Sequence, residues 1–271
     1  PAGVLALASN GRGRGYVSDP ILQNGHGLLA ILPFLEQTAL YDKFNHVAAY
    51  GDYRDPSVST PFPALTALAS GNAKLSVEKV PAYQCPSDSG DPIQLPASGG
   101  HYTASNTLPS RKVTYDFLMP DDTLCCANYH RNTSIANRYA FGENSFSPMA
   151  TITDGTSHTF AIGEITLQLY NGRTTGWSFA GWVSVGVDPV GSWNLTFPPT
   201  GINVWNYANR ASPPNNMRGQ RASWYNAASL HPGGCQFTMA DGSVHFISQT
   251  TDIVTLTNLS KIADGQAVNL P

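Results

Sequence analysis

Residues 231–248 predict a β-hairpin, and this hairpin constrains the fold more than any other segment. The run His231-Pro-Gly-Gly-Cys-Gln-Phe-Thr-Met-Ala-Asp-Gly-Ser-Val-His-Phe-Ile-Ser248 alternates apolar and polar residues on both sides of Asp241-Gly242. An Asp-Gly pair between alternating runs favours a two-residue type I′ turn, because both residues tolerate positive φ. Pro232, Gly233 and Gly234 precede the first strand, where proline cannot donate to a ladder and glycine permits a bend.

A two-residue turn fixes the register of the hairpin. The pairs expected to lie opposite each other on one side are Met239 with Val244, Phe237 with Phe246, and Cys235 with Ser248. That side is apolar and the other side is mixed, as in an antiparallel ribbon that places one face on a core.

Three further motifs precede the hairpin: Leu32-Pro-Phe-Leu-Glu-Gln-Thr-Ala-Leu-Tyr-Asp-Lys-Phe-Asn45, Val80-Pro-Ala-Tyr-Gln-Cys-Pro-Ser-Asp88 and Ile152-Thr-Asp-Gly-Thr-Ser-His-Thr-Phe-Ala-Ile-Gly-Glu164. With a His, nine residues and Asp-Gly at the C-terminal end, they resemble a large bacterial family of prepilin-like proteins, known chiefly from planctomycete-type genomes and related to type IV pilins and pseudopilins. The resemblance implies that the motif residues shape the fold. These are Pro33, Glu36, Cys85, Pro86, Asp88, Asp154, Gly155, His231, Pro232, Gly233, Gly234, Asp241 and Gly242.

The patterns and the resemblance together predict one α+β domain over residues 1–271. We expect a pilin-like arrangement in which an amphipathic helix from Pro33 to Asn45 packs on an antiparallel sheet. Strands are predicted at 111–117, 150–153 and 159–164, and a short helix at 255–262. Residues 165–225 hold all five tryptophans among glycines and prolines, which predicts an enlarged β-rich insertion with long loops.

Members of the resembled family begin with a prepilin peptidase site and a long apolar helix. This sequence opens at Pro1-Ala-Gly-Val with no apolar run of transmembrane length. The expectation is therefore that the N-terminal pilin helix, the only expected link to a membrane, is absent from these residues, and that contacts between subunits run from domain to domain.

Charge excludes some classes of partner. Charged residues make up 12% of the chain and the formal net charge is −3, against about 25% charged residues in ordinary soluble domains. Nucleic-acid binding needs a basic stripe that displaces counterions, and the sequence has none. Weak electrostatic repulsion suits a subunit that packs against copies of itself, and it suits an ordinary secreted domain equally well.

The four cysteines are Cys85, Cys125, Cys126 and Cys235. No CxxC pair and no closely spaced pair of histidines is present, so spacing argues against a zinc-finger type of site. Vicinal Cys125 and Cys126 cannot easily bond each other, so in an oxidising compartment we expect a disulfide between Cys85 and one of them. Cys235 is equally well explained as a small buried apolar residue.

Sequence motifs for catalysis are missing, and we expect no enzyme activity. No GxSxG, P-loop or HExxH motif occurs. His231 and Asp241 could be imagined as an acid–base pair, but a strand of ten residues is about 33 Å long, so residues at its two ends cannot touch.

Two binding hypotheses remain open. Asp154, Glu164 and Asp241 lie at or near predicted turns and could supply oxygen ligands to calcium as a cofactor, although aspartate also serves turns for purely structural reasons. Trp193 and Trp205 could stack on sugar rings, although tryptophan in β-rich segments mostly packs in cores.

The function expected from the resemblance is structural. The chain would be an exported, cell-surface or extracellular subunit that assembles through self-contact into a filament or a related assembly. The alternative is a secreted or anchored binding module that recognises a glycan or another surface protein through the tryptophan-rich loops.

Overall fold

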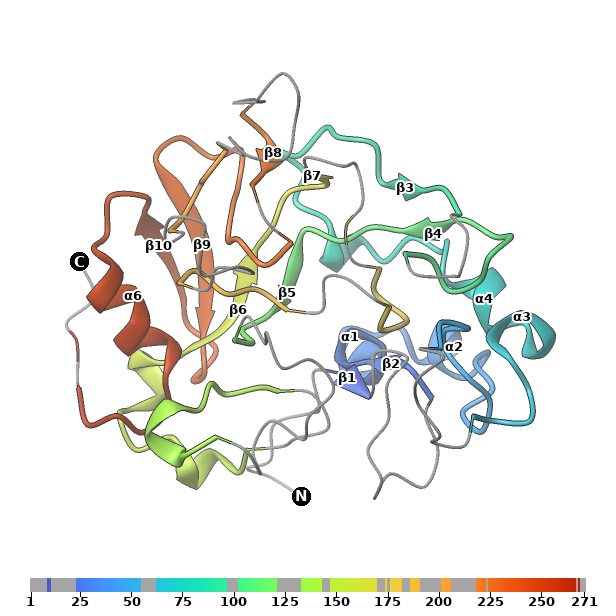
Figure 1. The fold of residues 1–271 in the computed structure, drawn as a ribbon, viewed down its shortest axis with the longest axis horizontal. Coiled ribbons are helices and arrows are strands. Elements are labelled where there is room, and N and C mark those ends of the chain that lie inside the picture. Colours follow the sequence, from blue (N-terminus) through green and yellow to red (C-terminus); the bar gives the residue numbers. More distant parts are fainter. Residues whose placement is uncertain are drawn as a thin grey trace.

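The structure, a computed structural model, combines a few short helices with mainly antiparallel β-sheets (Figure 1). It describes residues 9–10, 23–54, 62–96, 102–120, 133–142, 147–169, 174, 176–181, 186–190, 201–205, 218–222, 224–266 and 268. Within this part of the chain, no helix is both long enough and apolar enough to span a bilayer.

The main sheet has four strands in the order β10-β9-β6-β5, and each neighbouring pair is antiparallel. Its strands are β5 (Tyr115–Phe117), β6 (Phe160–Glu164), β9 (Gly234–Met239) and β10 (Val244–Ser248). Three two-stranded pairs lie outside it: β1 (Ser9–Asn10) with β2 (Gly25–His26), β3 (Ile93–Gln94) with β4 (Ser110–Arg111), and the parallel pair β7 (Gln168–Leu169) with β8 (Gln220–Arg221). The C-terminal hairpin is thus central to the fold.

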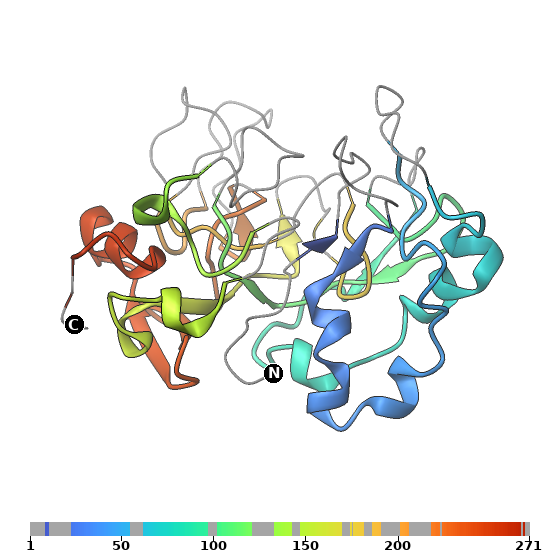
Figure 2. The same ribbon diagram turned by 90° about the horizontal axis from the view of Figure 1, so that it is seen from below.

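Most helical elements lie in two groups on opposite sides of the molecule (Figure 2). One side holds α1 (Gly27–Ala30), η1 (Leu32–Leu35), α2 (Thr38–Tyr41), α3 (Ala67–Ser70) and α4 (Asn72–Leu75). The other side holds η4 (Ile135–Asn137), η5 (Met149–Thr151), η6 (Thr156–His158) and α6 (Ile253–Ser260). The short η2 (Pro81–Tyr83) leads into the Cys85 turn.

The predicted single helix from Pro33 to Asn45 is wrong. Helical structure begins earlier, at α1, where the His26 side chain accepts a hydrogen bond from the backbone N–H of Leu28. It is interrupted at Glu36, which has a φ of +59°, and the Gln37 N–H donates to the Leu32 carbonyl at the end of η1. A left-handed residue cannot continue a right-handed helix, so the predicted helix is divided into η1 and α2.

The hairpin forms where the sequence predicts it, but its register differs by one residue. The Gly242 N–H bonds the Met239 carbonyl at 3.0 Å, and Gly242 has a φ of +88°. Asp241 is not among the described residues with positive φ, so the turn is not type I′. A type I turn followed by a left-handed glycine gives a three-residue loop, and this loop shifts every opposed pair.

The shift moves side chains to the opposite face of the ribbon. The observed pairs are Thr238 with Val244, Phe237 with His245, Gln236 with Phe246, Cys235 with Ile247, and Gly234 with Ser248. Val244 and Phe246 were expected to share the buried side with Met239 and Phe237, whereas they are 61% and 45% exposed on the other face.

Other predicted elements have mixed outcomes. The predicted strand at 159–164 is confirmed as β6, and the predicted helix at 255–262 is confirmed as α6 with an Asp252 N-cap. Residues 149–151 form the 3₁₀ helix η5 in place of a strand, and the predicted strand at 111–117 divides into β4 and β5.

One hydrophobic core connects residues from all parts of the described chain, from Leu28 to Ile262. The Phe160 ring stacks on Phe237, with ring centroids 4.3 Å apart. Trp177, from the tryptophan-rich segment, is fully buried and contacts Phe44 edge-on. The described part of the predicted insertion therefore contributes to the core of the fold.

Candidate functional site

Three of the sequence motifs meet at one cluster, formed by Cys85, Glu164 and His231. The Cys85 Sγ lies 3.5 Å from His231 Nε2, and the same nitrogen lies 3.4 Å from Glu164 Oε1. The sulfur, nitrogen and carboxylate atoms all lie within 4.8 Å of one another. Within the described part of the chain, this is the only group of three or more Cys, His, Asp or Glu side chains placed to share a metal ion.

Cys85 is held by the turn that follows η2. Its backbone N–H donates to the Thr114 hydroxyl, and its carbonyl accepts from the Asp88 N–H at 3.1 Å. The Asp88 carboxylate accepts from the Leu167 N–H at 2.8 Å, just beyond the end of β6. The conformation of the turn and the Asp88 side chain therefore anchor the cysteine beside the end of β6.

Glu164 ends β6 and is 1% exposed. Its Oε2 accepts a hydrogen bond of 2.6 Å from the backbone N–H of Gln236 on β9. Its Oε1 is buried and accepts no hydrogen bond from the described residues. Burial raises the pKa of the Glu164 carboxyl, and the Gln236 N–H, the nearby His231 and the side chains of Ser229 and Cys85 oppose this shift.

His231 reaches the cluster from the loop that enters β9, and its side chain is 30% exposed. Its backbone N–H donates to the Ser229 hydroxyl, which in turn donates to the Gly234 carbonyl at 2.7 Å. Gly233, with a φ of +86°, permits the bend between the histidine and the strand. The Pro-Gly-Gly sequence thus positions the imidazole over the end of β6.

Two further groups border the cluster. Tyr115 lies opposite Glu164 in the β5–β6 pair, and burial, followed by Cys85, raises the pKa of its phenol. Cys235 on β9 is fully buried, and burial raises the pKa of its thiol. Both groups are therefore held in their neutral forms at neutral pH.

The geometry at His231 argues against a nucleophile–base relay. In a Cys–His–carboxylate relay, the nucleophile and the carboxylate contact different nitrogens of the imidazole. Here the sulfur and the carboxylate oxygen both lie next to Nε2. Convergence of three donor atoms on one point is the arrangement of a metal-ligand set.

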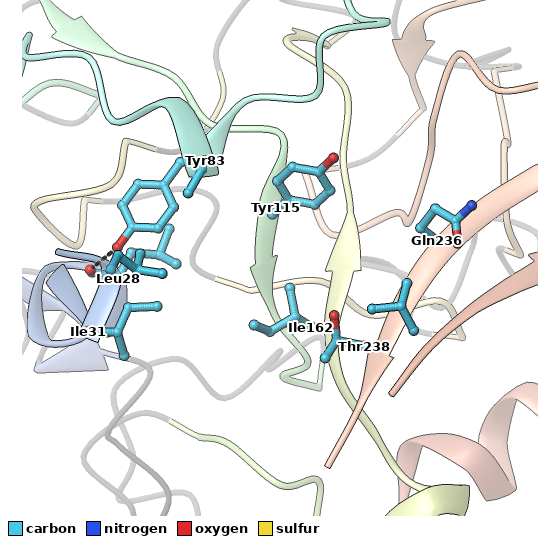
Figure 3. A pocket seen from close by; sticks show the side chains of 10 residues that line it. Leu28, Ile31, Tyr83, Tyr115, Ile162, Gln236 and Thr238 are labelled. Carbon is cyan, nitrogen blue, oxygen red and sulfur yellow. Dashed lines mark hydrogen bonds between the residues drawn. The ribbon is translucent and has the colours of Figure 1, made fainter. Parts of the chain in front are cut away.

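An apolar groove lies between the main sheet and the segments that carry α1, η1 and η2 (Figure 3). It has a volume of about 350 Å³. Tyr115, Ile162, Gln236 and Thr238 line it from the sheet, opposite Leu28, Ile31 and Tyr83, and Leu35, Ala82 and Val244 complete the lining. A second pocket of about 390 Å³ lies beside the Cys85 turn and is lined by Cys85, Pro86 and Asp88 among others. The second pocket thus contains Cys85 itself, and the groove reaches Tyr115 and Gln236, which lie next to Glu164 on the adjacent strands.

The other predicted motif residues have structural contacts. Asp154 accepts hydrogen bonds from the N–H groups of Asp264 and Gly265, so it fixes the C-terminal turn. Asp241 accepts from the N–H and the hydroxyl of Ser243 within its own turn, and these bonds lower the pKa of the Asp241 carboxyl. Gly155 has a φ of +105°, Pro33 occupies the first turn of η1, and Glu36 ends η1.

The proposed calcium ligands Asp154, Glu164 and Asp241 do not gather at one point, because each serves a different segment. His231 and Asp241 lie beyond opposite ends of β9, as expected. Cys85 and Cys235 are free cysteines, and the predicted disulfide partners Cys125 and Cys126 lie outside the described residues. Trp193 also lies outside them, and Trp205 is partly buried.

The sequence motifs include all three cluster residues, but they do not predict that these residues lie together. Cys85 and His231 were predicted to shape the fold, and Glu164 was assigned to a calcium site. Ligand spacing could not reveal the cluster, because Cys85 and His231 are separated by 146 positions. The sequence signal that could have indicated the cluster is the position of each residue next to the end of a different helix or strand.

No curated protein and no solved structure matches this chain. One family model does match, over residues 8–253, and it is described as SBP_bac_10, protein of unknown function (DUF1559). The match includes the Cys85 turn, the end of β6 and the whole C-terminal hairpin. The chain therefore belongs to the DUF1559 family.

Proposed function

We propose that this chain is an exported structural subunit, pilin- or pseudopilin-like, that assembles by self-contact into a cell-surface or extracellular filament or a related assembly. The pilin-like part of the proposal rests on the four sequence motifs and on the helices and antiparallel sheet of the fold. The self-contact rests on one observation, which is the exposed edge of the main sheet at β10.

Strand β10 forms this edge, and among the described segments only β9 pairs with it. Its sequence, Val244-His-Phe-Ile-Ser248, contains no lysine, glutamate or proline, and it displays Val244 and Phe246 to solvent. Natural proteins protect edge strands with charges, proline or bulges, because unpaired backbone groups recruit other strands. An unprotected apolar edge therefore favours a surface that is covered in an assembly.

The groove extends the apolar area next to this edge. Val244 lies at one side of it, and Ile31, Leu35 and Ile162 contribute further apolar surface. Exposed apolar patches rimmed by polar residues mark interaction sites in soluble proteins. With 12% charged residues, copies of the chain have little charge to separate them.

A second copy of the chain offers a complementary surface. Phe34 on η1 is 85% exposed, and Val254 on α6 is 64% exposed, so apolar side chains are also exposed on elements other than β10. A contact between two different surfaces of identical subunits is heterologous, and it builds open-ended arrays when its rotation does not close a ring. A filament can grow through a contact of this kind.

The test combines microscopy with variants of the edge strand. Electron microscopy of native cell-surface material, with the polypeptide identified by mass spectrometry, should reveal ordered assemblies. In the purified protein, Val244→Lys and Phe246→Lys should shift the sedimentation distribution to monomer while the circular dichroism spectrum stays unchanged. Leu95→Lys is the matched control, because Leu95 is 74% exposed but lies outside β10 and the groove.

A wild-type protein that stays monomeric at all concentrations would contradict the proposal, as would edge variants that assemble normally. A dispersed monomer that binds glycans or a surface protein would instead favour the binding-module alternative. Trp177 is buried in the core and cannot serve such a surface, whereas Trp205 is partly accessible. Loss of glycan binding in Trp205→Ala would then identify the binding loop.

A further inference from the structure

We propose that Cys85, Glu164 and His231 form a binding site for a divalent transition metal ion, with zinc as the best fit. The site is independent of the proposed self-assembly, since its donor atoms lie at the end of β6 and not on the β10 edge. It joins three segments that are far apart in the sequence.

Two of the three distances between the donor atoms match those around a zinc ion. Zinc binds cysteine sulfur at about 2.3 Å, histidine nitrogen at about 2.0–2.1 Å and carboxylate oxygen at about 2.0–2.2 Å, in a tetrahedral arrangement. Tetrahedral angles then place sulfur and nitrogen about 3.6 Å apart, and nitrogen and oxygen about 3.3–3.5 Å apart. The observed separations are 3.5 Å and 3.4 Å. The third pair, the sulfur and the carboxylate oxygen, lies within 4.8 Å. The separations at the histidine nitrogen therefore fit one tetrahedral ion.

The His231 Nε2 atom can make a full hydrogen bond to Glu164 or to Cys85, but not to both at once. If His231 Nε2 carries a proton, it can donate to Glu164 but cannot accept from the Cys85 thiol. If Nε2 carries no proton, it can accept from Cys85, but its lone pair then faces the carboxylate. Glu164 Oε1, buried at the centre of the cluster, has no hydrogen-bond partner among the described residues. A cation satisfies all three atoms together.

The types of ligand select the class of metal. A thiolate and an imidazole favour zinc and similar transition metals, whereas calcium and magnesium prefer oxygen ligands alone. Three protein ligands leave a fourth tetrahedral position for water or another donor. The exposed edge of His231 and the pocket beside Cys85 provide routes by which an ion can enter from solvent.

Surrounding groups already orient the three ligands. The Gln236 N–H fixes the Glu164 carboxylate, and the Thr114 hydroxyl fixes the backbone of Cys85. The Ser229 hydroxyl fixes the backbone at His231. Outer partners of this kind hold ligands in place before the metal arrives and raise its affinity.

The experiment uses the full chain, purified under reducing conditions and freed of metal by dialysis against a chelator. Titration with Co²⁺ should produce a sulfur-to-cobalt charge-transfer band, and Zn²⁺ should displace it. Metal analysis after Zn²⁺ loading and dialysis should find about one ion per chain, as for a single mononuclear site. Zn²⁺ should also raise the unfolding temperature, because a ligand that binds only the folded state stabilises it.

Variants separate the proposed ligands from other thiols and histidines. Cys85→Ser should abolish the charge-transfer band, and His231→Ala should weaken Co²⁺ binding at least tenfold, in line with losses of affinity at metal sites. His245→Ala is the matched control, since His245 lies on β10 outside the cluster and should leave the titration unchanged. Circular dichroism of each metal-free variant verifies that it is folded, and the partly exposed His231 tolerates replacement best.

A folded wild-type protein that gives no cobalt–thiolate band would overturn the proposal. A band that persists in Cys85→Ser would do the same, because it would arise from Cys125, Cys126 or Cys235. Peptide mapping that finds Cys85 in a disulfide in the native protein would also overturn it. None of these results depends on whether the chain assembles, so the site and the proposed function can fail separately.

Discussion

The observed hairpin register predicts that Gly234 tolerates a side chain much less well than Gly242. A Cβ atom added at Gly234 would collide with the Ile247 carbonyl oxygen and would lie 2.9 Å from the carbonyl carbon of the same residue. These are backbone atoms of the paired strand, so rotation of a side chain cannot relieve the contact. At Gly242, a Cβ atom would meet nothing within 4 Å, and only the positive φ of 88° opposes it.

The two costs differ in kind and in size. Forcing extra volume into a packed site costs roughly 1–3 kcal/mol, and losing a ladder hydrogen bond at the end of the β9–β10 pair adds about 1 kcal/mol. We therefore expect Gly234→Ala to lower the free energy of unfolding by about 2–4 kcal/mol. For Gly242→Ala, the left-handed penalty of about 1–2 kcal/mol is partly offset by the reduced entropy of the unfolded chain, which leaves about 1 kcal/mol.

Urea unfolding followed by circular dichroism measures both variants. Equal m-values would show that the surface exposed on unfolding is unchanged, so the difference in midpoint reports stability. The result that refutes the reasoning is a Gly234→Ala variant as stable as Gly242→Ala. In the alternative two-residue register, Gly234 would not lie opposite Ser248, and the collision with Ile247 would disappear.

Three other variants test separate parts of the fold. Burial, with a smaller effect from Tyr41, raises the pKa of Tyr50 from 10.0 to about 12. The folded state therefore binds this proton more tightly than the unfolded state, so the contribution of Tyr50 to stability is complete below pH 10.0 and is lost as the pH rises through about 12. When the free energy of unfolding is measured against pH, Tyr50→Phe should lose less stability than the wild-type protein over that interval. Arg221→Ala should destabilise the protein by about 3 kcal/mol or more, because the fully buried guanidinium donates to backbone carbonyls and to the Thr174 hydroxyl. Arg221→Met, which fills the same space without a charge, should recover part of this loss in the same urea assay. Asp154→Ala should cost about 1 kcal/mol and increase hydrogen exchange at the two amides of the C-terminal turn that the carboxylate holds; unchanged exchange there would contradict its structural assignment.

Local chemistry in the sequence was enough to place several elements. The Asp241-Gly242 pair located the hairpin turn, and the alternation around it located both strands. The strand at Phe160–Glu164 and the helix at Ile253–Ser260 were also predicted close to their observed bounds. These elements are marked by neighbouring residues, because turn residues and side-chain periodicity act over a few positions.

Tertiary structure decided the register of the hairpin and the course of the chain around Glu36. An Asp-Gly sequence suits both a two-residue and a three-residue loop. The protein adopts the three-residue loop, and in the resulting register Phe237 packs on Phe160. The left-handed conformation of Glu36 carries no signal of its own, since apolar spacing continues through the break. Propensity is a weak influence that long-range packing overrides.

The sequence by itself determined the turn chemistry, the low charge and the motif residues of this protein. Only the tertiary structure brought Cys85, Glu164 and His231 to one point, and only it turned Val244 and Phe246 toward solvent. The physical reason is that turns and periodicity depend on neighbours along the chain, whereas a ligand cluster and an exposed sheet face depend on which strands pair and in what register.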